Sequence, residues 1–220
     1  MAVRLLLADH QRMSMSCSNV PPILIVFYSV HGSTQALAEA IAHGVESTGL
    51  EAMLRQVPRV SDNLDITQAS VPAAGAPFVT LEDLTQCSGL ALGSPTRFGN
   101  MAAPVKYFLD QTSAQWLNGS LIDKPACVFT SSSSMHGGQE ATLISMQIPL
   151  LHHGMVICGL PYSNAALHTT TTGGSPYGVS HVAIDGIQTL SADELALAKA
   201  QGERIANLAI KLYQNEGKES

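Results

Sequence analysis

Residues 23–35 read ILIVFYSVHGSTQ, an apolar run that gives way to small and polar residues. Six consecutive apolar and aromatic residues suit a strand that is buried on both faces of a parallel sheet. Apolar residues then recur at helical spacing from Ala36 to Val45, and Gly49 is a suitable helix end. This stretch therefore predicts a buried strand, a polar loop at 29–33 and a helix.

The same order of strand, polar loop and helix returns along the rest of the chain. Further strands are expected at 51–57, 89–93, 126–130 and 155–158. Helices are expected from Thr80, where a capped turn begins, and at 103–110, 140–153 and 191–213, the last opened by a capping box. The stretches 58–77 and 159–190 lack periodicity and are expected to be loops. The alternation predicts one α/β domain, a doubly wound five-stranded parallel sheet with helices on both faces.

The chain ends are expected to lie outside this domain. Residues 1–20 are expected to be a disordered N-terminal extension that Pro21 and Pro22 terminate, and residues 215–220 a frayed tail. The domain is then residues 21–214.

Composition excludes several classes of function. Charged residues make up 13% of the chain, against roughly 25% in an average domain, so much surface is buried in a core or hidden in an oligomer. The net charge of −6 argues against a nucleic-acid partner and against a polybasic membrane anchor. No apolar run approaches the ~18 residues of a membrane span, so no integral membrane contact is expected.

The four cysteines predict a reducing compartment. Cys17, Cys87, Cys127 and Cys158 lie far apart and form no C-x-x-C motif. Buried, reduced thiols in a cytoplasmic protein are the simplest interpretation.

Three polar loops are expected to meet at one edge of the sheet. They follow Tyr28, Gly93 and Thr130, and ligands of doubly wound sheets bind beyond the carboxyl ends of the strands. In the first loop, hydroxyls, a flexible Gly32 and a helix N-terminus form a phosphate cradle without Lys or Arg. A capped strand-to-helix turn is the alternative. The loop is neither a Walker loop nor a dinucleotide fingerprint, since the chain holds no G-x-G.

The other two loops also allow two interpretations each. Residues 94–100 could wrap the edge of a flat ring, or form a proline turn in which Arg97 is solvated or pairs with Asp110. Residues 131–138 are rich in hydroxyl donors, or are flexible low-complexity sequence. Together the three loops could hold a phosphate and a planar heteroaromatic, which fits FMN.

Several motifs give the chain a specific resemblance. They are Ser29-x-x-Gly32-x-Thr34, GSPTRFGNM at 93–101, FLDQT at 108–112, GGQE at 137–140, HHGMV at 152–156 and GGSPYG at 173–178. In this order, over residues 23–212, they resemble the WrbA family of flavin-dependent NAD(P)H:quinone oxidoreductases. The resemblance implies a flavodoxin-like fold and a homotetramer with one FMN per subunit. It also implies two-electron reduction of quinones to hydroquinones by NAD(P)H, in a ping-pong hydride transfer through FMN.

The resemblance implies FMN contacts, position by position. They are Ser29, Val30, His31, Gly32, Ser33 and Thr34 at the phosphate, Thr96, Arg97 and Phe98 at the ring, Ser132, Ser133, Ser134, Met135, His136 and Gly137 in a third segment, and His152. Trp116 and His31 would serve the substrate pocket, although His31 stands where the family often has Tyr. No catalytic side chain and no metal are expected, because the cofactor carries the chemistry.

Alternatives remain at this stage. A flavodoxin-type electron carrier would have a strongly acidic docking surface, which sparse charge disfavours. A regulatory protein with an incidental flavin is a third hypothesis. Trp116 could be core, His152 and His153 could only favour their helix dipole, and Tyr177 could lie in a surface turn or at a neighbouring subunit's pocket.

Overall fold

The computed structural model describes residues 19–61, 72, 74–186 and 188–216. Most of the expected extension and the last four residues of the expected tail lie outside this set. The elements are β1 (Ile23–Phe27), α2 (Ser33–Glu46), β2 (Ala52–Gln56), α3 (Leu81–Gln86), β3 (Gly89–Arg97), β4 (Asn100–Met101), α4 (Ala103–Asp110), α5 (Ser113–Leu117), β5 (Pro125–Ser132), α6 (Gln139–His152), β6 (Val156–Ile157), α7 (Ala166–Thr169), β7 (Val179–Val182), a 3₁₀ turn (Ile184–Gly186) and α8 (Ala192–Glu216).

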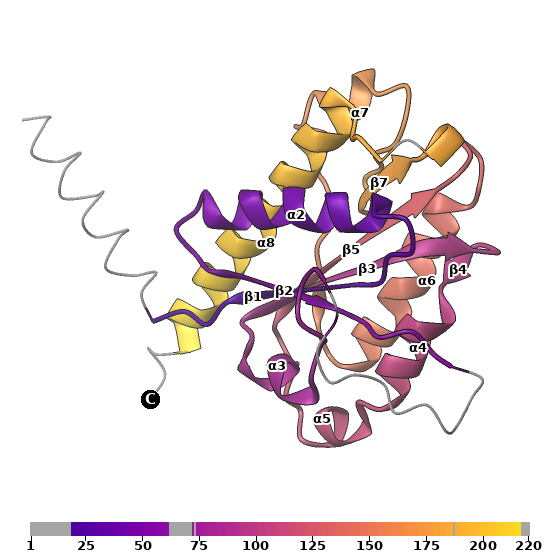
Figure 1. Cartoon of the computed structure of the whole chain (residues 1–220). Coiled ribbons are helices and arrows are strands. Elements are labelled where there is room, and N and C mark those ends of the chain that lie inside the picture. Colours follow the sequence, from indigo (N-terminus) through magenta and orange to yellow (C-terminus); the bar gives the residue numbers. More distant parts are fainter. Residues whose placement is uncertain (1–18, 62–71, 73, 187, 217–220) are drawn as a thin grey trace, which may run out of the picture.

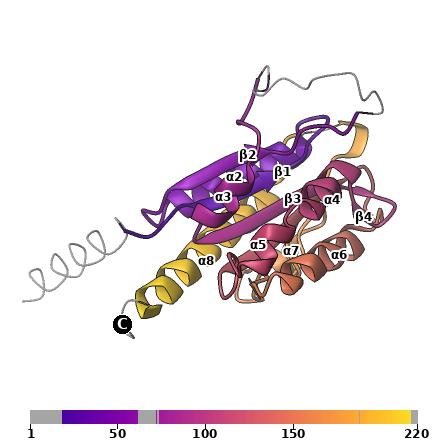
Figure 2. The ribbon, with the colours of Figure 1, turned by 90° about the horizontal axis from the view of Figure 1, so that it is seen from below.

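A parallel sheet forms the middle layer, with strand order β2-β1-β3-β5-β6. Helices α2 and α8 cover one face, and α3, α4 and α6 cover the other (Figures 1 and 2). Chain order reverses at β1, whose Ile25 pairs with Leu54 of β2 on one side and Ala91 of β3 on the other. The doubly wound α/β architecture is therefore confirmed.

Each face of the sheet has its own apolar core. Strand residues such as Ile25 and Phe129 pack under α2 and α8, whereas Leu24 and Val128 pack under the helices of the other face. Helices α2 and α8 touch at glycine: a Cβ on Gly44 would lie 2.1 Å from the Lys199 carbonyl oxygen. No larger residue fits there, so the sequence of α2 sets how closely the two helices pack.

The second polar loop differs from its prediction. Strand β3 continues through Pro95 to Arg97 rather than ending at Gly93, and a two-residue turn leads back into antiparallel β4. Both turn residues, Phe98 and Gly99, have positive φ (52° and 75°). Pro and Gly suggested an irregular loop, but Pro95 is compatible with extended backbone and Gly99 supplies the tight hairpin turn.

The stretch expected as a loop at 159–190 holds α7 and β7. Strand β6 pairs with Pro125 and Ala126, and β7 pairs with β5 from Phe129 to Ser132, so the two short strands share one edge of β5. With β4, the described sheet has seven strands rather than the expected five. Strands of two and four residues leave too little alternation to be recognised in a sequence.

Two capping boxes begin helices as their sequences indicate. Thr80 Oγ1 accepts a hydrogen bond from Asp83 N–H while the Asp83 carboxylate accepts one from Thr80 N–H. Ser191 and Glu194 make the same reciprocal pair at the start of α8. Among the described residues, no helix is long and apolar enough to cross a membrane.

Candidate functional site

The three polar loops meet at one cavity of about 330 Å³ beyond the carboxyl ends of β1, β3 and β5. Its walls are Ser29, Val30, His31, Ser33, Thr34, Pro95, Thr96, Arg97, Ser131, Ser132, Ser133, Ala183 and Gly186. We call it the loop cavity. Ala183 and Gly186 form a fourth wall between β7 and α8 that the sequence did not indicate, because they lie in a stretch without periodicity.

The first loop is shaped by Gly32, which caps α2 with φ of +91°. Its N–H donates to Ser29 Oγ (3.0 Å), and its carbonyl accepts the first intrahelical bond, from Ala36 N–H (2.9 Å). The first N–H groups of a helix lack intrahelical partners and carry partial positive charge. The first turn of α2 contains no acidic residue, so this end of the cavity favours an anion.

A buried hydroxyl pair joins the first loop to the third. Thr34 Oγ1 and Ser131 Oγ lie 2.8 Å apart, and both residues are almost fully buried. Ser132 Oγ donates to the Ser134 carbonyl (2.7 Å), which bends the third loop back on itself. Of the third segment, Ser132 and Ser133 line the loop cavity. The other expected contacts of this segment, Ser134, Met135, His136 and Gly137, do not.

The β3–β4 hairpin forms the second wall. Thr96 Oγ1 hydrogen-bonds Thr142 Oγ1 of α6, and Arg97 Nη1 donates to the Thr96 carbonyl (2.8 Å). The Arg97–Asp110 pair is not formed, because Asp110 pairs with Lys106. Phe98 is fully exposed at the hairpin tip and does not line the loop cavity.

The donor set of the loop cavity fits a phosphate ester with a polyhydroxyl chain. Among the residues that the structure describes, its lining contains seven hydroxyl side chains and no carboxylate, with Arg97 as the one guanidinium. Hydroxyls and backbone N–H groups at a helix start are the groups that bind phosphate without a lysine. FMN has this chemistry, so the residues present fit the expected cofactor.

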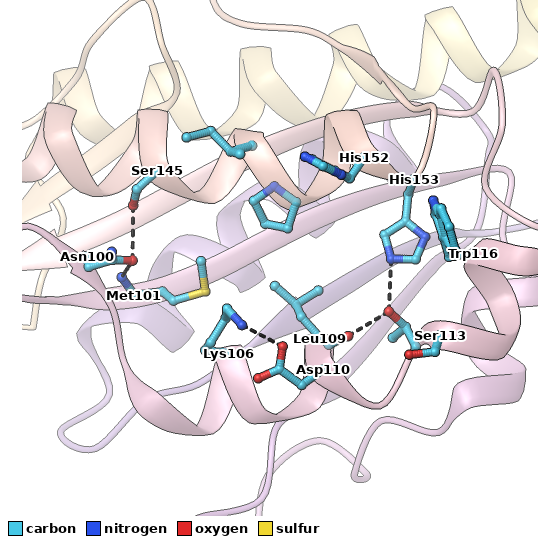
Figure 3. A pocket seen from close by; sticks show the side chains of 13 residues that line it. Asn100, Met101, Lys106, Leu109, Asp110, Ser113, Trp116, Ser145, His152 and His153 are labelled. Atoms are coloured by element: carbon cyan, nitrogen blue, oxygen red, sulfur yellow. Dashed lines mark hydrogen bonds and ion pairs between the residues drawn. The ribbon is translucent and has the colours of Figure 1, made fainter.

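A second, larger cavity of about 700 Å³ is lined by residues of β4, α4, α5 and α6 and the turns beside them (Figure 3). Its lining is Asn100, Met101, Lys106, Leu109, Asp110, Thr112, Ser113, Trp116, Ser145, Ile148, Pro149, His152 and His153. We call it the Trp116 cavity. Within one chain, the structure therefore does not bring Trp116 and His152 into the loop cavity with the other expected contacts. Trp116 is 54% exposed, which contradicts a core role.

His153 ties the end of α6 to the turn between α4 and α5. Its Nε2 hydrogen-bonds Thr112 Oγ1 (2.9 Å), while its buried Nδ1 has no hydrogen-bond partner within the described part of the chain. Burial and, to a lesser extent, neighbouring His152 lower the pKa of His153. The lowered pKa disfavours the cationic form of His153, which is the form that a helix C-terminus would stabilise.

Comparison with known proteins now adds to this geometry. The model of the family described as NADPH-dependent FMN reductase matches residues 22–169. A protein of Syntrophobacter fumaroxidans named NAD(P)H dehydrogenase (quinone) is 46% identical over 202 residues, covering 88% of this chain and 99% of its own. A protein of the same name from Geotalea daltonii is 43% identical, with coverage of 86% and 97%.

Solved structures support the fold. A protein of Agrobacterium tumefaciens described as a flavodoxin, WrbA-like protein, superposes with a TM-score of 0.60 at 23% identity, covering 87% of this chain and 98% of its own. A flavodoxin from the Archaea superposes with a TM-score of 0.56 at 22% identity, with coverage of 85% and 98%. The flavodoxin-like fold and the resemblance drawn from the motifs are thus confirmed, and the chain belongs to the NADPH-dependent FMN reductase family, alongside relatives named NAD(P)H dehydrogenase (quinone).

Proposed function

We infer that the chain is an FMN-dependent NAD(P)H dehydrogenase that reduces quinones to hydroquinones. The observation that carries this is the loop cavity, in which hydroxyl-rich loops from three strands meet at the switch point of the sheet. The chemistry that FMN supplies when bound is two-electron transfer from NAD(P)H to a quinone. The protein then needs only to bind FMN and orient the two substrates against it, and no nucleophilic side chain is required.

We propose roles for the lining residues from their positions in the loop cavity. Residues 29–34 and the first turn of α2 would hold the phosphate with neutral donors. Ser132 and Ser133 would serve the polyol chain, and Thr96 and Arg97 would contact the ring edge. Arg97 would place a positive charge near the ring edge, which would favour a cofactor that gains negative charge on reduction. His31, at the mouth of the cavity, is proposed to contact the nicotinamide substrate.

We propose a homotetramer as the working assembly. Ile144, Ile148 and Leu151 form an exposed apolar face on α6, and Leu117 beside Trp116 is 75% exposed. Such apolar area is typical of an interface between subunits. Because Trp116 and His152 line a different cavity of the same chain, they reach a cofactor only by facing the loop cavity of another subunit.

We also propose a cytoplasmic location. The three described cysteines, Cys87, Cys127 and Cys158, are all unbridged thiols, as expected in a reducing compartment.

An anaerobic titration of FMN-loaded protein with NADH tests the function. Flavin absorbance is expected to be lost on adding NADH and to return on adding benzoquinone. Protein that dithionite reduces but NADH does not would contradict the dehydrogenase and favour an electron carrier. A monomer in gel filtration would contradict the proposed tetramer separately.

A further inference from the structure

Two cysteines that lie far apart in sequence are neighbours in the sheet. Cys127 is in β5, and Cys158 follows directly after β6. Ala126 pairs with Ile157 in the parallel register, and Cys158 N–H donates to the Ala126 carbonyl (2.8 Å), so the next residues on each strand stand side by side. Neighbouring strands lie about 4.8 Å apart, which falls inside the Cα separation of about 4.4–6.8 Å that disulfides span.

Both thiols point into the same layer. They belong to the apolar core between the sheet and α2 and α8, with exposed fractions of 0% for Cys127 and 5% for Cys158. Cys87, the third described cysteine, is buried in the core of the opposite face. The Cys127–Cys158 pair is therefore separated by the sheet from the other described thiol.

The two thiols are chemically unequal. The interaction between the two thiols, together with burial, raises the pKa of Cys127, and the same interaction lowers the pKa of Cys158. Burial opposes the lowering at Cys158, and the guanidinium of Arg204 on α8 supports it. A thiol of lowered pKa beside a thiol of raised pKa is the arrangement of a reactive and a resolving cysteine.

We propose that Cys127 and Cys158 form a reversible dithiol–disulfide couple that a small neutral hydroperoxide oxidises. The thiolate of Cys158 attacks one peroxide oxygen, the O–O bond breaks, and a sulfenic acid and hydroxide form. Cys127 sulfur then attacks the sulfenic sulfur, the S–S bond forms, and the S–OH oxygen leaves as water. With hydrogen peroxide, the two cysteines lose two electrons and the peroxide becomes two waters, so the step balances.

The position of Cys158 gives the bond a structural consequence. The disulfide would tie β5, whose carboxyl end carries Ser131 and Ser132, to the start of the segment that leads to β7. It would thus cross-link the outer edge of the sheet where two short strands share β5.

The test counts thiols rather than activity, so it is independent of the proposed dehydrogenase. FMN-loaded Cys17→Ser/Cys87→Ser protein, freed of reductant, is treated with hydrogen peroxide, denatured and alkylated. Alkylation of both remaining thiols is expected to be lost, with no covalent dimer, and to return after dithiothreitol. A non-reducing peptide map of oxidised wild-type protein is expected to contain the Cys127–Cys158 cross-link, which covers the event that the double variant does not fold.

Single variants separate the two roles. Both single variants are made in the Cys17→Ser/Cys87→Ser background. With Cys127→Ser, Cys158 is expected to give a sulfenic acid that dimedone traps. With Cys158→Ser, Cys127 is expected to react with hydrogen peroxide at least about tenfold more slowly than Cys158 does. Two thiols that remain alkylatable after peroxide would overturn the proposal. Cross-links to Cys17 or Cys87, or between chains, in place of Cys127–Cys158 would overturn it equally.

Discussion

Thr34 Oγ1 and Ser131 Oγ lie 2.8 Å apart although the residues are 97 positions apart in sequence. This hydroxyl pair joins the first turn of α2 to the carboxyl end of β5 at the floor of the loop cavity. A buried hydroxyl without a partner costs about 1–3 kcal/mol, so neither side chain is free to turn away. The pair holds the first and third loops in one fixed arrangement.

Thr34→Val is expected to weaken FMN binding with little change in shape. The isopropyl group fills nearly the same space as the threonine side chain, but it removes one hydroxyl at the phosphate end and leaves Ser131 without its partner. Loss of about 1.4 kcal/mol corresponds to a tenfold higher FMN dissociation constant, measured by flavin fluorescence on apoprotein. Thr85→Val, at an exposed position of α3, is the control. Equal affinity in Thr34→Val and wild type would contradict the phosphate assignment.

A change at Gly32 would be a poorer test of the same site. A Cβ there would lie 2.9 Å from Gln188 Oε1, on a backbone whose φ of +91° suits glycine. Loss of FMN from such a variant would follow from strain in the loop even if the phosphate bound elsewhere.

The Trp116 cavity carries the second prediction. Trp116→Ala is expected to raise the quinone KM several-fold while leaving FMN affinity and the melting temperature nearly unchanged, because the side chain is half exposed. Steady-state kinetics with gel filtration at the assay concentration measure it. Tyr107→Ala, which truncates an exposed aromatic side chain of α4 that lines neither cavity, is the matched control. A Trp116→Ala protein that is tetrameric and has the wild-type quinone KM would exclude Trp116 from the substrate pocket.

Sequence patterns predicted the strands and loops that local chemistry determines, and they missed the features that depend on contacts between residues far apart in sequence. The run 23–28 and the hydroxyl-rich loops were recognisable because burial on both faces and turn chemistry leave local signatures. The partnership of Thr34 with Ser131 left none, since either hydroxyl alone suits a capped turn. Strand β7 exists because β5 offers it an edge and Gln201 Oε1 accepts from Val179 N–H (2.7 Å). The four residues of β7 carry no periodicity of their own, so the sequence could not predict that Ala183, which follows them, lines the loop cavity.

Glu194 carries the third prediction, which concerns the loss of folding stability at low pH. Its buried carboxylate accepts N–H bonds from Gly173 (2.8 Å), Val182 (3.1 Å) and Ser191 (2.8 Å), and pairs with His181 Nδ1 (2.8 Å). Burial raises its pKa, but these hydrogen bonds, the one to His181 first, outweigh burial and lower the pKa to about 2. The carboxylate thereby pins the segment that leads from β7 to the wall of the loop cavity.

A depressed folded-state pKa stabilises the protein above the unfolded value and loses that effect on acidification. The contribution of Glu194 is therefore fully present above about pH 5, and about 3 kcal/mol of it is lost as the pH falls toward 2. Urea unfolding of wild type and Glu194→Gln across pH 2–7 measures this. The difference between the two is expected to shrink at low pH, and Glu51→Gln, at an exposed position, is the matched control. A difference independent of pH would contradict the ionised, hydrogen-bonded state.

Phe98 links strain in the hairpin to function. A phenylalanine with φ of 52° and a fully exposed ring costs folding free energy that a turn residue would not, and such strain persists where a site uses it. Phe98→Asn, which tolerates positive φ, is expected to raise the stability of the apoprotein toward urea by about 1 kcal/mol while lowering kcat/KM for quinone. Asn keeps the turn and removes only the ring, so opposite changes in stability and activity assign the ring to the site. If stability and kcat/KM both rise, or if neither changes, Phe98 is a surface residue. The ring contact implied by the resemblance then does not exist in this chain.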